Sequence, residues 1–120
     1  MQKLLYAIFG VVLIGALSIV SAQTQIQAGR YSVNANSSGY TLDKSSGDRT
    51  YTVEVVFTKP FESRPQVVVT VSTVDAEKTT NVRYSVEATA VSRDGFTVKI
   101  TTWGDSKLYG LGGSWIAFTE

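Results

Sequence analysis

Two runs of alternating polar and apolar residues, between Asn81 and Tyr109, constrain the fold of this chain more than any other feature. Tyr84, Val86, Ala88 and Ala90 share one face of the first run, opposite Arg83, Ser85, Glu87 and Thr89; Phe96, Val98 and Ile100 share one face of the second, opposite Thr97, Lys99 and Thr101. A repeat of two residues is that of a β-strand with one buried face. Asp94-Gly95 between the runs predicts a tight hairpin turn, with the positive φ on the glycine.

Four further strands are predicted around this hairpin, at residues 23–33, 49–58, 66–74 and 112–119. In the second of these, Tyr51, Val53, Val55 and Phe57 point inward, and Val56 is exposed where it would suit an interface. Residues 34–48 are rich in Asn, Ser, Gly and Asp and predict a loop, and Pro60 and Pro65 predict a turn from which Phe61 folds back over the core. We therefore expect an all-β chain, a six-stranded antiparallel β-sandwich with no helix after residue 22.

The N-terminus has the pattern of a secretory signal. An uncharged apolar run from Leu4 to Val20 follows Lys3, and Ser21-Ala22 then provides the small residues of a signal-peptidase cleavage site. We therefore expect a cleavable signal helix over residues 1–22. The alternative is a retained membrane anchor, because about 17 apolar residues approach the length needed to span a bilayer. We expect a secreted, extracellular protein with an N-terminal edge strand and polar loop over 23–48 and a sandwich core over 49–120.

Charge and cysteine content bound the partners of the mature chain. Loss of Lys3 with the signal changes 11 basic and 10 acidic residues to ten of each, so the net charge is zero. This balance argues against nucleic acid and against membrane binding or insertion by the mature domain. The chain has no Cys, so no disulfide supports this small exported domain, and we expect subunit association to stabilise it. Asn36 begins a glycosylation sequon, Asn36-Ser37-Ser38. The sequence does not distinguish a glycosylated Asn36 from an unmodified asparagine in a polar loop.

Residue types also limit the chemistry. The chain contains no His and no Cys, which removes the usual proton shuttle, thiol nucleophiles and standard zinc ligands. Its loop aspartates have no calcium-loop spacing, so we expect no enzyme activity, no metal and no cofactor. Recognition of a small polar ligand fits better, since a neutral sugar needs an aromatic surface and planar hydrogen-bonding groups.

Four side chains are candidates for such a site, and each has a structural alternative. Trp103 is either a ligand platform or a lid on the core, and Arg83 is either a ligand donor or half of a surface ion pair. Asp48 either binds a ligand or is part of an ordinary turn with Gly47. Tyr109 either contacts a ligand or packs under the loop that contains Gly110. The residues alone indicate an exported, oligomeric β-sandwich that is a candidate binder.

Several ordered segments resemble the H-type lectins, the family of the snail agglutinins and of the discoidin C-terminal domains. They are Val56-Phe57-Thr58-Lys59-Pro60-Phe61, Arg64-Pro65-Gln66-Val67-Val68-Val69, Val74-Asp75, Asn81-Val82-Arg83-Tyr84, Gly95-Phe96-Thr97-Val98, Thr102-Trp103, Lys107-Leu108-Tyr109 and Ser114-Trp115-Ile116-Ala117. The resemblance implies a six-stranded sandwich that forms a homotrimer. It also implies binding of glycans with terminal galactose or N-acetylgalactosamine in clefts between subunits, in adhesion or cell recognition.

The resemblance places the carbohydrate-binding residues at Gly47, Asp48, Arg83, Trp103, Gly104 and Tyr109. Gly104 stands where the snail agglutinin pattern has a histidine, so one side-chain contact is missing, and Asp105 or a backbone amide near Gly104 is a substitute. A second hypothesis follows from this departure: a structural or adhesive module that oligomerises but has lost sugar binding.

Overall fold

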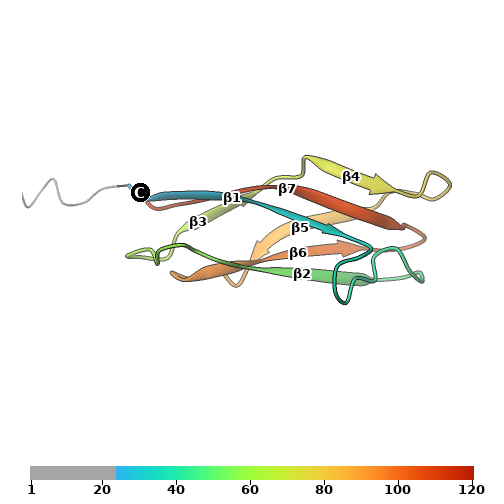
Figure 1. The fold of residues 1–120 in the computed structure, drawn as a ribbon, viewed down its shortest axis with the longest axis horizontal. Coiled ribbons are helices and arrows are strands. Elements are labelled where there is room, and N and C mark those ends of the chain that lie inside the picture. The colour runs from blue at the N-terminus through green and yellow to red at the C-terminus, as the bar shows by residue number, and fades with distance from the viewer. Residues whose placement is uncertain (1–23) are drawn as a thin grey trace, which may run out of the picture.

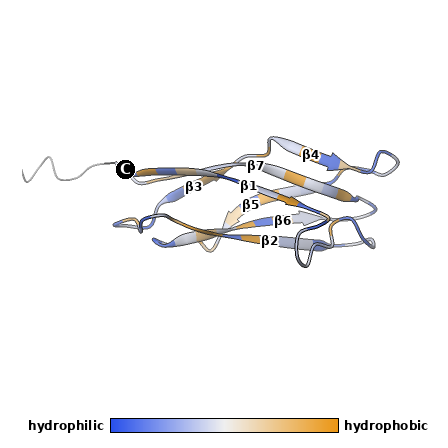
Figure 2. Cartoon of the chain, viewed as in Figure 1, coloured by the Kyte–Doolittle hydropathy of each residue, from blue (hydrophilic) through white to orange (hydrophobic). Residues whose placement is uncertain are grey.

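The structure, a computed structural model, describes residues 24–120 and contains seven antiparallel strands in two sheets (Figure 1). The predicted signal helix over residues 1–22 lies outside the described residues. Sheet A consists of β1 (Ile26–Asn34), β7 (Leu108–Phe118), β3 (Gln66–Val69) and β4 (Thr73–Ala76), with β7 in the centre. Sheet B has β6 (Gly95–Thr102) between β2 (Arg49–Val56) and β5 (Tyr84–Thr89). Hydrophobic and hydrophilic residues alternate along the strands (Figure 2).

The fold confirms the all-β, antiparallel prediction, with one strand more than expected. The predicted strand at 66–74 is divided into β3 and β4, which both pair with β7. Val69 pairs with Trp115 and Thr73 with Gly112, so three residues of this edge face two residues of β7. The extra residue is a bulge that interrupts an otherwise continuous edge strand.

The core lies between the sheets and is largely aromatic at its centre. Phe96 and Phe57 from the sheet B side contact Trp115 of β7, with ring centroids 5.3 and 5.8 Å apart. Phe61 is 1% exposed and packs edge-on against Phe57, as predicted. Val56 is 81% exposed, which confirms its predicted outward position.

The β5–β6 turn differs from the sequence prediction. Gly95 does not have a positive φ; the left-handed residue of this turn is Ala90, with a φ of 51°. A Cβ atom on Gly95 would collide with the carbonyl oxygen of Val55. Glycine is therefore required by the close approach of β2, rather than by the turn conformation.

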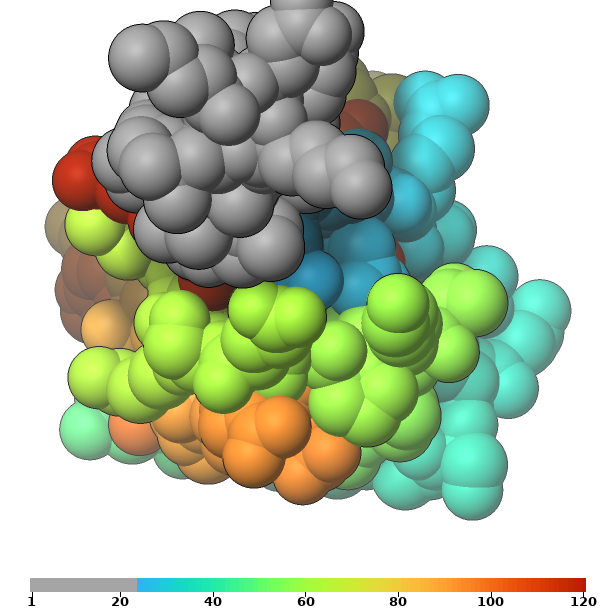
Figure 3. Space-filling model, turned by 90° about the vertical axis from the view of Figure 1, so that its left-hand side faces the viewer, coloured from blue at the N-terminus to red at the C-terminus, as the bar shows by residue number. Residues whose placement is uncertain are grey.

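The two ends of the sandwich are built differently. At the end that carries the chain's C-terminus, the Phe61 amide donates to the Arg93 carbonyl at 2.9 Å, and residues around 60 lie beside the turn around 93 (Figure 3). The opposite end, called the distal end below, is formed by the polar segments 35–48, 77–83 and 103–107 (Figure 1). The loop after β4, which begins with Glu77-Lys78-Thr79-Thr80, is hydrophilic (Figure 2).

Candidate functional site

Sheet B places three of the predicted site residues side by side at the distal end. In the last register row, Arg49 of β2 and Tyr84 of β5 both pair with Thr102 of β6. Asp48, Trp103 and Arg83 are each one residue beyond this row. Because neighbouring strands lie about 4.8 Å apart, the three residues follow one another across the end of a single sheet.

A buried arginine holds the first two of these segments together. The Arg49 guanidinium donates to the carbonyl oxygens of Gly47, Lys44, Gly104 and Ser106, at 2.9, 2.9, 3.0 and 2.7 Å, and is 8% exposed. The Gly47 amide donates to the Gly104 carbonyl at 2.9 Å. Asp48 is exposed and is thereby fixed beside the Trp103–Gly104 turn. Our sequence analysis missed this role of Arg49, although the alternation that places Tyr51 inward also places Arg49 inward.

Ser106 fixes the third segment. Its hydroxyl donates to the Asn81 carbonyl at 2.7 Å and accepts a hydrogen bond from the Arg83 amide at 2.9 Å. Thr102 Oγ1 in turn donates to the Arg83 carbonyl at 2.6 Å. Ser106 and Thr102 are both fully buried, so the backbone of Arg83 is held by side chains that have no access to solvent. Polar anchors of this kind restrict a loop because releasing either one leaves a buried hydrogen-bonding group unsatisfied.

The Arg83 side chain projects from this anchored backbone toward Asp105. Its Nη1 atom lies 3.5 Å from Asp105 Oδ1, and the two side chains are 46% and 55% exposed. Asn81 Nδ2 donates to the same carboxylate oxygen at 3.3 Å. An ion pair this exposed contributes less than about 1 kcal/mol, so a ligand can displace it at little cost.

Gly104 is required by its backbone conformation. Its φ is +67°, and a Cβ atom there would lie 3.2 Å from Arg83 Nη1. A histidine at this position would be strained and would push against the arginine. The turn at Gly104 is therefore too tight for a histidine, and it places backbone atoms, rather than a side chain, next to Arg83.

Trp103 is 39% exposed and is not part of the buried core, in which Trp115 is the tryptophan. This exposure does not fit a core lid and fits a surface that a ligand can reach. In Arg83, by contrast, the ion-pair alternative is realised, since it contacts Asp105.

Tyr109 is held by different contacts, on sheet A. β7 has an extra residue at this point, because Asp75 pairs with Gly110 and Ala76 pairs with Leu108. The bulge turns Tyr109 outward, 37% exposed, and its hydroxyl donates to Glu77 Oε2 at 2.6 Å. This bond lowers the pKa of Glu77 and raises the pKa of Tyr109. Within residues 24–120, no hydrogen bond joins Tyr109 to the Asp48–Trp103–Arg83 row.

The segments that carry Tyr109 and Arg83 nevertheless run alongside each other. The Glu77 amide donates to the Lys107 carbonyl at 3.0 Å, and Ser106 bridges to Asn81 further along. Segments 77–83 and 104–109 thus lie side by side. Tyr109 is at one end of this pair of segments, and Arg83 and Gly104 are at the other. The described residues contain no group of three or more acidic, His or Cys side chains arranged to hold a metal.

The distal end therefore presents an exposed acid, an indole ring and a guanidinium across adjacent strand ends of an all-β sandwich, and these are group types that can contact a sugar. Residues 52–118 match the H-type lectin domain, and the chain belongs to this family. The predicted family resemblance is confirmed.

Solved structures share the fold of this chain. Discoidin II from Dictyostelium discoideum superposes with a TM-score of 0.72 at 26% identity, over 82% of this chain and 37% of the discoidin chain. The tailspike of Pseudomonas phage phi297 shares the fold, with a TM-score of 0.51 and 15% identity over 81% of this chain and 16% of the tailspike. A curated relative from Fuscovulum blasticum, described as ATP synthase subunits region ORF 7, is 33% identical over 72 residues. That match spans 60% of this chain and 63% of the relative.

Proposed function

We propose that this protein is an exported, trimeric lectin that binds glycans ending in galactose or N-acetylgalactosamine, without a metal or cofactor. The observation that carries the proposal is the row of Asp48, Trp103 and Arg83 across adjacent strand ends of sheet B. The family is one of binding proteins, which supports recognition rather than catalysis. Within residues 24–120, no helix is long and apolar enough to cross a membrane.

Each residue has a defined role in the proposal. Asp48 accepts hydrogen bonds from sugar hydroxyls, and Arg83 leaves Asp105 to donate to neighbouring oxygens. Trp103 and Tyr109 cover the apolar C–H face of the ring. Gly47 and Gly104 allow the two turns to approach the sugar with their backbones, and the amide after Gly104 replaces the contact of the missing histidine.

In the proposed trimer, the Asp48–Trp103–Arg83 row of each copy lies in a cleft beside the neighbouring subunit. The outer face of sheet B, with its Thr, Ser and paired charges on β5 and β6, forms the subunit contact. Thr97 Oγ1 already bonds both carboxylate oxygens of Glu54 on this face, at 3.0 and 2.9 Å. A single wet site of this kind binds a monosaccharide with a Kd on the order of 0.1–1 mM. Three sites on one assembly raise avidity for a cell surface by roughly 10² to 10⁴, which suits adhesion or cell recognition.

A second function is favoured by a specific observation: in this structure the Arg83 head group is already paired with Asp105, beside a glycine that offers no side chain. A domain with this arrangement could assemble through protein contacts and have no sugar site. A glycan array of the purified protein separates the two functions, with Trp103→Ala and Asp48→Ala as the test variants. Sedimentation analysis of the same sample establishes whether it is a trimer.

We expect signal on galactose- or N-acetylgalactosamine-terminated glycans that both substitutions abolish. A trimer that gives no signal on any such glycan would support the structural module instead. Chelation of metals leaves the signal unchanged if the site is metal-free, as proposed.

A further inference from the structure

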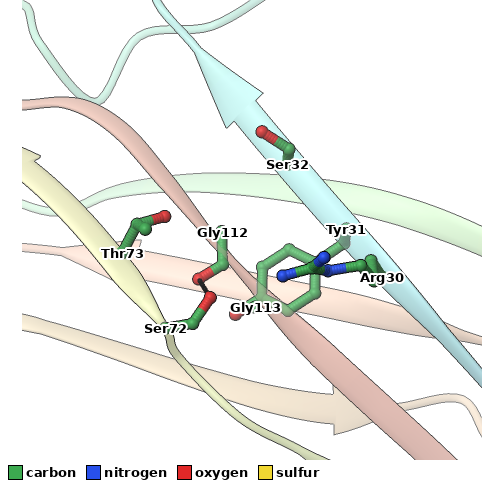
Figure 4. A pocket seen from close by; sticks show the side chains of 7 residues that line it. All are labelled: Arg30, Tyr31, Ser32, Ser72, Thr73, Gly112 and Gly113. Carbon is green, nitrogen blue, oxygen red and sulfur yellow. Dashed lines mark hydrogen bonds between the residues drawn. The ribbon is translucent and has the colours of Figure 1, made fainter.

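A second hollow lies away from the distal end, on the outer face of sheet A (Figure 4). It has a volume of about 340 Å³. Its lining comes from three neighbouring segments: Arg30 and Ser32 of β1, Gly112 and Gly113 of β7, and Ser72 and Thr73 where the β3–β4 bulge meets β4. This volume is within the range of pockets that hold small ligands.

The hollow exists because the central strand has no side chain where its neighbours do. Ser32 and Thr73 both pair with Gly112, so the three form one cross-strand row whose middle member is bare. A Cβ atom on Gly112 would lie 3.2 Å from Thr73 Oγ1 and would fill the floor. The β3–β4 bulge turns consecutive residues, Ser72 and Thr73, toward the same hollow.

The floor is rigid. The Tyr31 side chain crosses beneath Gly113, and its hydroxyl donates to the Thr70 carbonyl at 2.7 Å (Figure 4). The Ser72 amide donates to the Gly112 carbonyl at 2.8 Å, and the Ser72 hydroxyl to the same atom at 3.3 Å. A ligand would therefore meet a preformed surface rather than a mobile loop.

The lining carries one charge. Arg30 is exposed, and within residues 24–120 its guanidinium takes part in no salt bridge. No acidic residue lines the hollow, and the hydroxyls of Ser32 and Thr73 stand opposite each other across it. A guanidinium fork matches a carboxylate, and flanking hydroxyls match the hydroxyls of a sugar ring.

An apolar row adjoins this polar one. Ala28 and Val68 both pair with Ile116, two residues along the strands from the row of Arg30 and Ser114. Val68 is 52% and Ile116 47% exposed. Along the outer face of sheet A the order is therefore the hydroxyls of Ser32 and Thr73, then the Arg30 guanidinium, then the apolar row at Ile116. A sugar acid in the hollow can thus place its carboxylate at Arg30 and its hydroxyls toward Ser32 and Thr73.

We propose that this hollow is a second carbohydrate site, specific for a sugar acid whose carboxylate is bound by Arg30 and whose hydroxyls contact Ser32 and Thr73. It goes beyond the galactose-type site proposed above, because it lies on a different sheet face and uses none of the same residues.

Glucuronate and glucose form a matched pair of probes, since they differ at the C6 carboxylate. We would titrate each into the ¹⁵N-labelled protein and follow the amide shifts of Gly112 and Gly113. Glucuronate should shift both amides, and glucose should bind at least tenfold more weakly. Arg30→Gln should weaken glucuronate binding by roughly 10- to 100-fold, the loss expected for charge-assisted hydrogen bonds. Lys59→Gln, the same charge change at an exposed position outside the hollow, should have no effect on it.

Three results would overturn the proposal: no shift of Gly112 and Gly113 with glucuronate, equal affinity for glucose, or unchanged binding by Arg30→Gln. Inorganic sulfate tests the sugar part separately. If sulfate at the same concentration shifts these amides as strongly as glucuronate, the hollow is an anion site only. Trp103→Ala should leave the glucuronate shifts intact, so failure of the galactose-type site and failure of this one are distinguishable.

Discussion

Replacing Arg49 with methionine tests how the distal end is held together. Methionine keeps much of the buried aliphatic volume but removes every hydrogen bond that the guanidinium donates to segments 42–47 and 104–106. Two loops that are far apart in sequence would then be joined mainly by the Gly47–Gly104 backbone bond.

The magnitude follows from which carbonyl groups lose their partner. The Ser106 carbonyl is in a buried bond of 2.7 Å, and a buried acceptor left unsatisfied costs about 1–3 kcal/mol. The hydrogen bond from Arg49 Nη1 to the Leu42 carbonyl is long, at 3.4 Å. This carbonyl also accepts a hydrogen bond from the Leu108 amide at 3.0 Å, so its loss of Arg49 adds little to the free-energy cost. The remaining three bonds are part-buried, and water can replace them at a smaller cost. We expect a total loss of about 2–5 kcal/mol, a large fraction of the 5–15 kcal/mol typical of a domain.

Urea denaturation followed by tryptophan fluorescence measures this loss. Arg64→Met is the matched control, because Arg64 is exposed and its Nε donates a single bond, to the Val91 carbonyl at 3.0 Å. We expect the control to cost less than about 1 kcal/mol. If Arg49→Met lies within about 0.5 kcal/mol of the control, the arginine does not organise the distal end and our account of that end is wrong.

Three further predictions concern single positions. Gly95→Ala and Gly95→Asn should destabilise alike, by about 1–3 kcal/mol in urea, because both add a Cβ atom against the Val55 carbonyl; a tolerated asparagine would restore the positive-φ explanation. Gly104→Ala should cost about 1–2 kcal/mol and should also shift the Arg83 side-chain resonance, which an unstrained turn would leave in place. Burial raises the pKa of Tyr40 to about 12, so in an ultraviolet pH titration one tyrosine should ionise near pH 12, and Tyr40→Phe should remove that step. Since this pKa is raised by folding, the stability it contributes is fully present below pH 10 and is lost as the pH rises toward 12; a wild-type chain whose tyrosines all ionise near pH 10 would contradict this.

The sequence was most informative where one face of a strand is buried. In β2 and β6, alternation correctly predicted which residues point inward, because a shift of one residue would exchange the core and solvent faces. The same rule placed Val56 outside, and the turn predicted from Pro60 and Pro65 correctly placed Phe61 inside.

The central strand β7 was the least predictable element. It begins at Leu108, four residues before the predicted start at Gly112, and three of its residues are glycines with weak strand preference. Pairing on both sides, with β1 and with β3 and β4, fixes it as a strand. The bulges at Thr70–Ser72 and at Tyr109 arise from this pairing, and the pattern of a single strand does not contain it.

The candidate site shows the same division. Asp48, Trp103 and Arg83 could be named from sequence, and their juxtaposition follows from the register of three strands that alternation identified. The contact of Tyr109 with Glu77 and the burial of Ser106 beneath Arg83 depend on how the loops pack. Loop sequences have no periodic pattern from which such packing could be predicted. Local spacing therefore indicated which residues to consider, and the sheet decided which of them meet.

The central claim is that a galactose-type sugar binds across the distal strand ends, and a titration of N-acetylgalactosamine into the ¹⁵N-labelled protein tests it most directly. We expect saturable shifts at the Asp48, Arg83 and Gly104 amides and at the Trp103 indole, and none at Gly95 at the opposite end. No saturable shift at the first four groups, or shifts centred on Gly95, would contradict the claim.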